Sequence, residues 1–239
     1  MIRPLAFNYN VQTAVNNHYQ KANDFNSNSN QINIIEGSVK IPKPLLSKSK
    51  EKLLSIRQKK ALEDLEELIK GGYPQLTMSE IAAKLKVSLR TLYAIAPSKE
   101  KLLLIAVDRL LFKIGREAQR AIKKEETPLN TLKTFLKETN KALDPTMLAF
   151  TKEFGELPGA KELVDSHEVF VMNITERLLE EAITNKEIIN IDTSAMALIL
   201  SGLGREIHKR SSEYPFNNGP LETNNAMIDV IMLGLENNN

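Results

Sequence analysis

Apolar and polar positions along this chain recur with the period of the α-helix, and no stretch keeps the two-residue alternation of a strand. Over residues 99–123, Leu102, Ile105 and Leu110 mark one such apolar stripe. Similar stripes, with breaks at Pro or Gly residues, predict further helices over about 50–70, 129–143, 146–155, 160–184, 194–210 and 222–235. The sequence therefore predicts an all-α protein.

Residues 77–93 contain two short amphipathic patterns separated by a turn. Thr77 and Glu80 form a capping box, in which the side chain of each residue accepts a hydrogen bond from the backbone amide of the other. Lys86 and Val87 fall between the two patterns, and Ser88 can cap the second helix. These signals predict two helices joined by a tight turn.

The second of these helices has an apolar side and a polar side. Leu89 and Leu92 lie three residues apart and can be buried, while the residues between and after them stay exposed. Such a pair of helices is typical of a helix-turn-helix, whose second helix enters the DNA major groove. Arg90 is the predicted base reader, because a guanidinium can form two hydrogen bonds to a guanine edge. The predicted DNA-contacting residues are Thr77, Ser88, Arg90, Thr91, Tyr93 and Lys99.

This region resembles the DNA-binding domain of the TetR/AcrR family of transcriptional regulators, over about residues 52–120. The resemblance rests on Thr77, Ile81-Ala82, Val87-Ser88, Thr91-Leu92-Tyr93, Pro97-Ser98-Lys99-Glu100 and Leu102-Leu103-Leu104. It implies a homodimer that binds a double-stranded DNA operator and responds to a small-molecule effector. Lys86 stands where the family often has Gly, so the turn must avoid a left-handed backbone or strain Lys86.

The charge of the chain is unevenly distributed. Residues 48–101 hold twelve Lys and Arg against seven Asp and Glu, a net charge of +5, whereas residues 102–239 have a net charge of −5. The positive segment coincides with the predicted helix-turn-helix, as expected of a DNA-binding domain attached to an acidic one. A solvated surface of the same charge is the alternative.

Composition divides the chain into three parts. Residues 1–46 are rich in Asn and lack a sustained apolar face, which predicts a disordered polar arm. Residues 47–98 are the predicted helix-turn-helix domain, made of three helices. Residues 99–239 are the predicted helical domain for effector binding and dimerisation. A tail that binds a partner or follows DNA is the alternative for the arm.

Several classes of chemistry lack a candidate in the sequence. There is no Cys, no His pair at metal-binding spacing, no Gly-rich phosphate loop and no nucleophile motif. No apolar run is long enough to span a bilayer, so no membrane partner is expected and the expected location is cytoplasmic. We therefore expect no catalytic residue, no metal and no cofactor, and a protein that is not an enzyme.

Two further surfaces are predicted in the C-terminal helices. An effector pocket is expected among apolar residues for each of which the core is the stronger interpretation, namely Val107, Leu111, Phe135, Met147, Phe150, Phe154, Phe170 and Ile174. The last two helices are unusually apolar, and a second copy of the chain can cover them. The expected dimer-interface residues are Leu203, Met227, Ile231 and Leu235.

The function expected from these features is that of a sequence-specific DNA-binding regulator, a ligand-responsive repressor that acts as a homodimer. The alternative is a helical interaction or adaptor protein that keeps the fold and has lost DNA binding. The net charge of +5 around the predicted helix-turn-helix and the presence of Arg90 and Lys99 argue for the regulator.

Overall fold

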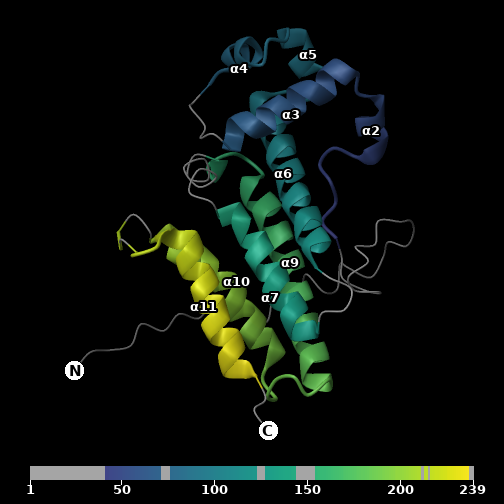
Figure 1. Cartoon of the computed structure of the whole chain (residues 1–239). Coiled ribbons are helices and arrows are strands. Elements are labelled where there is room, and N and C mark those ends of the chain that lie inside the picture. The colour runs from purple at the N-terminus through teal and green to yellow at the C-terminus, as the bar shows by residue number, and fades with distance from the viewer. Residues whose placement is uncertain are drawn as a thin grey trace, which may run out of the picture. The chain divides into compact units, whose positions relative to one another are not determined.

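The computed structural model describes residues 41–70, 76–122, 127–143, 154–210, 213–214 and 216–236 (Figure 1). All of them belong to one compact unit, Ile34–Asn239. The described secondary structure is helical, apart from an isolated bridge between Ile188 and Glu236. The predicted all-α fold is confirmed. Met147, Phe150 and residues 1–40 of the expected arm lie outside the described residues.

The helix-turn-helix region is built from four helices, which we call the head. They are α2 (Lys48–Leu53), α3 (Ile56–Lys70), α4 (Met78–Lys84) and α5 (Leu89–Tyr93). The remaining elements form what we call the body: α6 (Lys99–Ala121), α7 (Pro128–Thr139), the 3-10 helix η1 (Asn140–Leu143), α9 (Ala160–Thr184), α10 (Thr193–Lys209) and α11 (Gly219–Leu235).

Helix α6 connects the head to the body. It packs against α3 on one side and against α7 and α9 on the other, while α10 lies between α9 and α11 (Figure 1). The core is continuous across this junction. Leu62 and Leu65 of α3, Leu92 of α5, and Leu102 and Leu103 of α6 are almost fully buried in one cluster. A shift of α6 relative to α9 therefore reaches the head through packed side chains.

The stretch 50–70 is two helices instead of the single helix that its apolar spacing predicted. Ser55 begins α3 with a capping box, since Gln58 Oε1 accepts the Ser55 amide at 2.7 Å and Ser55 Oγ accepts the Gln58 amide at 3.3 Å. Ser47 caps the preceding helix α2. The Ser55 cap and the extended backbone of Leu54 place a break at residues 54–55, which the apolar periodicity alone does not reveal.

The last residues of the expected polar arm are packed against the body. Pro42 and Leu46 are buried, and the Leu45 amide donates a hydrogen bond of 2.8 Å to Oδ2 of the buried Asp108 on α6. The predicted boundary at residue 46 is therefore too late. The apolar side chains that follow the Pro residues find a surface on α6, a contact that the local composition could not show.

The turn between α4 and α5 uses a left-handed backbone at Lys86, whose φ is 53°. Of the two possibilities that the sequence left open, strain at Lys86 is the one observed. The Lys86 amide bonds the Ala83 carbonyl, and Arg57 Nη2 donates to the Lys86 carbonyl at 3.4 Å. These bonds hold the turn in a conformation that L-residues other than Gly adopt at a cost of about 1–2 kcal/mol.

We expect Lys86→Gly to raise the free energy of unfolding by about 1 kcal/mol, because glycine adopts the left-handed turn without a steric penalty. Chemical denaturation followed by circular dichroism measures the change. Ala83→Gly, at an exposed position inside the neighbouring α4, is the matched control and should lower stability by about 1 kcal/mol. A loss of stability in Lys86→Gly similar to that of the control would contradict the strained turn.

Candidate nucleic-acid interface

The N-terminus of α4 is fixed by the capping box that the sequence predicted. The Thr77 amide donates to Glu80 Oε2 at 2.7 Å, the Thr77 hydroxyl donates to the same oxygen at 2.7 Å, and the Glu80 amide donates back to Thr77 Oγ1 at 3.3 Å. These bonds from the Thr77 backbone and hydroxyl lower the pKa of Glu80. The hydroxyl proton of Thr77 is thus engaged by a carboxylate, so its predicted phosphate contact has a competitor.

Helix α5 is held by a cap at its start and by a buried side chain in its centre. Ser88 Oγ accepts the Thr91 amide at 3.2 Å and lies 2.8 Å from the Thr91 hydroxyl oxygen. Leu92 is fully buried, as predicted. Arg90 and Tyr93 are exposed, as predicted, with 53% of Tyr93 accessible. The outward side of α5 therefore presents a guanidinium and a phenol from a fixed backbone.

Leu89 is exposed to 40%, and the prediction that it is buried is wrong. Helix α5 has only five residues, and Leu92 is the one whose side chain is buried. The consequence is that an apolar side chain stands beside Arg90 on the accessible side of α5. Because its spacing from Leu92 predicted burial, Leu89 was not among the residues predicted to contact DNA.

Lys99 begins α6 close to the start of α4. The charge of Lys99 contributes to the lowered pKa values of both Glu80 and Glu100, although hydrogen bonds from Thr77 and from the backbone of Glu100 are the larger causes. Ser98 caps α6 by accepting the Lys101 amide at 3.2 Å. Lys99 thus lies within electrostatic range of Glu80, the capping-box partner of Thr77.

The first turn of α3 supplies positive charge next to α5. Arg57, Lys59 and Lys60 are exposed there, and the bond from Arg57 to the Lys86 carbonyl fastens this end of α3 to the turn that precedes Ser88. The sequence showed these residues only as part of the positive net charge of residues 48–101. Their position near α5 follows from the tertiary packing of α3 on α5.

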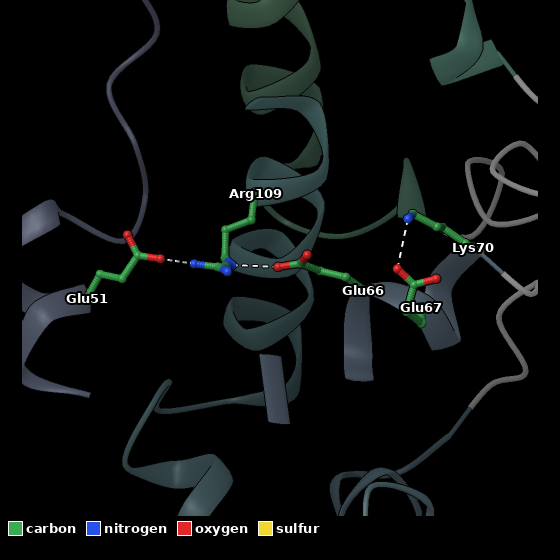
Figure 2. A network of polar contacts seen from close by, with 5 residues as sticks. All are labelled: Glu51, Glu66, Glu67, Lys70 and Arg109. Carbon is green, nitrogen blue, oxygen red and sulfur yellow. Dashed lines mark hydrogen bonds and ion pairs between the residues drawn. The ribbon is translucent and has the colours of Figure 1, made fainter. Parts of the chain in front are cut away.

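An ion-pair network joins the head to α6. Arg109 on α6 lies between two carboxylates: its Nε contacts Oε1 of Glu66 on α3 at 2.5 Å, and its Nη1 contacts Oε1 of Glu51 on α2 (Figure 2). Only 8% of the Glu66 side chain is accessible. Burial disfavours the charged guanidinium, but the hydrogen bonds to Glu66 and Glu51 more than offset this, so the pKa of Arg109 lies above its ordinary value.

The residues predicted to line an effector pocket are packed in the core where the structure describes them. Val107, Phe135, Phe154, Phe170 and Ile174 are buried, and Leu111 is half-buried. A cavity of about 660 Å³ lies elsewhere, where the starts of α6 and α9 meet the segment before α2. Its walls include Lys43, Leu45, Lys101, Leu104, Glu162 and Leu163. Both readings of the predicted residues, core and pocket, were open in the sequence, and their burial favours core.

A second feature of the body was not foreseen. Asn224 on α11 is 1% exposed, and within the described part of the chain neither its Nδ2 nor its Oδ1 has a hydrogen-bond partner. A buried amide in this state is costly, by about 1–3 kcal/mol for each unsatisfied group, and calls for a polar partner. The apolar stripe that defined this helix in the sequence gave no indication of it.

The last two helices leave an apolar surface uncovered, which we call the α10–α11 face. Its large side chains are exposed to between 40% and 66%, namely Leu198, Ile199, Met227, Val230 and Leu233. Of the residues predicted for a dimer interface, Met227 belongs to this face, whereas Leu203 and Ile231 are half-buried. Leu235 is 6% exposed, so most of its side chain is covered by its own chain. The antiparallel bridge between Ile188 and Glu236 closes the chain over it.

The geometry defines a helix-turn-helix protein with a helical C-terminal body, the fold of DNA-binding transcription regulators. Residues 65–106 match the model of the bacterial regulatory proteins of the tetR family. The resemblance to the TetR family is thus confirmed, by sequence in the helix-turn-helix and by fold over about three quarters of the chain.

Solved structures with this fold come from distant organisms. A TetR transcription regulator from Haloarcula marismortui is 15% identical, with a TM-score of 0.63 over 76% of this chain and 98% of that one. A putative transcriptional regulator from Pseudomonas aeruginosa PAO1 is 20% identical, with a TM-score of 0.57 over 74% and 91%. Reduced NemR from E. coli is 15% identical, with a TM-score of 0.59 over 73% and 97%. No curated protein matches the sequence. None of the described helices has the length and apolar character that a membrane crossing requires.

Proposed function

We propose that this protein is a homodimeric, ligand-responsive transcriptional repressor that binds a double-stranded DNA operator through α5. The observation that carries the proposal is the presentation of α5, which Ser88 caps and Leu92 anchors while Arg90 and Tyr93 project into solvent. Arg90 is the proposed base reader, through two hydrogen bonds to a guanine edge. Leu89, exposed beside it, is suited to contact a thymine methyl group.

Phosphate contacts would come from residues around α5. Tyr93 and Lys99 lie on the two sides of the segment that joins α5 to α6, and the amides at the start of α6 add the positive end of a long helix. Thr77 is the weakest of these candidates, because Glu80 already accepts its hydroxyl proton. Such contacts orient the protein on DNA and carry no base specificity.

The proposed dimer interface is the α10–α11 face. Five large apolar side chains on two adjacent helices form a patch of the kind that monomeric proteins seldom expose. Two-fold pairing of this face would place four helices in one bundle and separate two copies of α5 for binding to two half-sites. At the edge of this face, Lys133 and Lys137 of α7 both pair with Asp229 and so link α7 to α11.

The proposed effector acts through the contact between α6 and α9. A ligand in the cavity beside Leu104 and Leu163 would touch both helices. It would favour one position of α6 over another only if it binds the two positions with different affinity. Because α6 shares its core with the head, a shift of α6 would change the spacing of the two recognition helices.

We expect Arg90→Ala to lose about 1–3 kcal/mol of binding free energy on the preferred duplex and to relax specificity at one base pair. Lys99→Ala should weaken all duplexes about equally and reduce the slope of log affinity against log salt by about one unit. The preferred duplex is first enriched from a random pool with the wild-type protein, and fluorescence anisotropy then measures each variant on it.

Two results would count against this assignment. If Arg90→Ala keeps both the affinity and the base preference of the wild type, α5 does not read the bases. If the wild-type protein enriches no sequence and binds no duplex, the protein is a helical adaptor and the repressor proposal fails.

A further inference from the structure

Helix α2 carries a basic surface that the helix-turn-helix does not include. None of its residues is buried, and Lys48, Lys50 and Lys52 are exposed. Successive residues of a helix are about 100° apart, so Leu53 lies nearly opposite Glu51, and Lys50 and Lys52 stand on the two flanks between them. Leu53 is 85% exposed. The outward side of α2 is therefore one apolar side chain between two ammonium groups.

Two consecutive residues of α6, Asp108 and Arg109, hold α2 and the segment before it against the body. Before the helix, the Leu45 amide bonds the buried carboxylate of Asp108. Within the helix, Glu51 pairs with Arg109 (Figure 2). His167 Nε2 of α9 lies 3.0 Å from the second oxygen of Asp108, which fixes that carboxylate in turn. A short helix with no buried residue is thus fastened by its inner side, and its lysines have a defined position.

The lysines of α2 belong to a positively charged stretch of chain, residues 47–60, which ends in the first turn of α3. Residues 47–60 contain six Lys and Arg and a single acid, Glu51, which shares Arg109 with Glu66, and Lys60 pairs with Asp64 outside this stretch. The segment runs from α2 to Arg57, which contacts the turn that precedes α5. A polyanion bound along α5 would therefore be attracted to this positive stretch as well. Under the proposed function, that polyanion is a DNA duplex.

We infer that α2 is a second DNA contact, in which Lys50 and Lys52 bind backbone phosphates beside the base pairs that α5 reads. The inference rests on the proposed function, because it assigns a further surface to the same duplex. An anionic lipid surface is also attracted by lysines around an apolar side chain. DNA is favoured because the basic stretch 47–60 leads along the chain from α2 to Arg57, which bonds the turn that precedes α5.

The test compares the double variant Lys50→Gln/Lys52→Gln with Lys141→Gln/Lys161→Gln, which removes the same charge from exposed positions of the body. Each released phosphate contact lowers the salt slope by about 0.9, so the α2 variant should lose about two units of slope. Between 50 and 200 mM salt, the wild type should then lose about ten-fold more affinity than this variant. The loss should be the same on the preferred duplex and on a scrambled one. The body variant and Lys50→Arg/Lys52→Arg should keep the wild-type slope.

Failure of this inference is distinguishable from failure of the proposed function. If the wild type enriches a sequence but the α2 and body variants share its slope, only the α2 contact is overturned. Vesicles of phosphatidylglycerol and phosphatidylcholine provide the second arm. Vesicle binding that Lys50→Gln/Lys52→Gln abolishes, with an unchanged salt slope on DNA, would assign the surface to lipid and overturn the DNA contact. Thermal melting should be the same for both variants, because all four lysines are exposed.

Discussion

Arg109→Met should lower the free energy of unfolding by about 3–5 kcal/mol, because it leaves the Glu66 carboxylate buried without its counter-charge. The apolar stem of Met replaces the packing of the arginine stem, so the missing charge dominates the effect. Glu51, which is 40% accessible, can turn to water and adds little. Urea denaturation followed by circular dichroism at a fixed protein concentration measures the change, since the stability of a dimer depends on concentration.

The same region offers two controls for Arg109→Met. Lys70→Met removes the cation of an exposed pair with Glu67 on the same α3, a contact that water replaces easily, and should change stability little (Figure 2). The double variant Glu66→Leu/Arg109→Met exchanges the buried ion pair for apolar side chains and should recover most of the loss. A single variant Arg109→Met with the stability of Lys70→Met would show that Glu66 reaches water.

Val230→Glu should convert the protein to a folded monomer and reduce its affinity for the preferred duplex by about 10²–10⁴-fold. Val230 is 62% exposed on the α10–α11 face, so the isolated chain can hold a glutamate there in water. In a two-fold interface the same carboxylate would be buried without a partner and close to its own symmetry copy. The loss of affinity follows because two linked half-sites bind far more tightly than one. Light scattering gives the mass, and fluorescence anisotropy gives the affinity.

Two substitutions on α11 separate dissociation from unfolding. Val230→Thr keeps the size of the side chain without adding a charge and should remain dimeric. Leu235→Glu places the charge at a position that is 6% exposed within the chain, and it should unfold the protein instead of dissociating it. A wild type that is monomeric at micromolar concentration, or a Val230→Glu variant that stays dimeric, would remove the α10–α11 face as the interface.

Local signals in the sequence were sufficient for the helix-turn-helix. The Thr77–Glu80 capping box and the Ser88 cap are contacts between residues three positions apart. The burial of Leu92 follows from the apolar stripe of its helix. Such features are set by backbone geometry and side-chain type, which a sequence displays directly. The same reasoning could have found the break before α3, because Ser55 and Gln58 form a capping box that was overlooked.

Side chains at the edges of packed surfaces were predicted less well. Leu89 and Leu92 share one spacing pattern, yet one is 40% exposed and the other is fully buried. Leu235 and Leu233 are both apolar residues of α11, and the first is covered by its own chain while the second is 66% exposed. Periodicity shows that a helix has an apolar side, but it does not show how far neighbouring helices cover that side.

By itself, the sequence of this protein determined the helical class, the local structure of the helix-turn-helix and the concentration of positive charge around it, because each depends on residues that are near neighbours along the chain. Only the tertiary structure decided that Arg109 joins Glu51 to Glu66, that Asp108 bonds the Leu45 amide and that the α10–α11 face stays uncovered. These contacts join residues 43 to 63 positions apart or depend on which helices pack together. The free energy of such pairs depends on burial and mutual geometry, which exist only once the helices have packed.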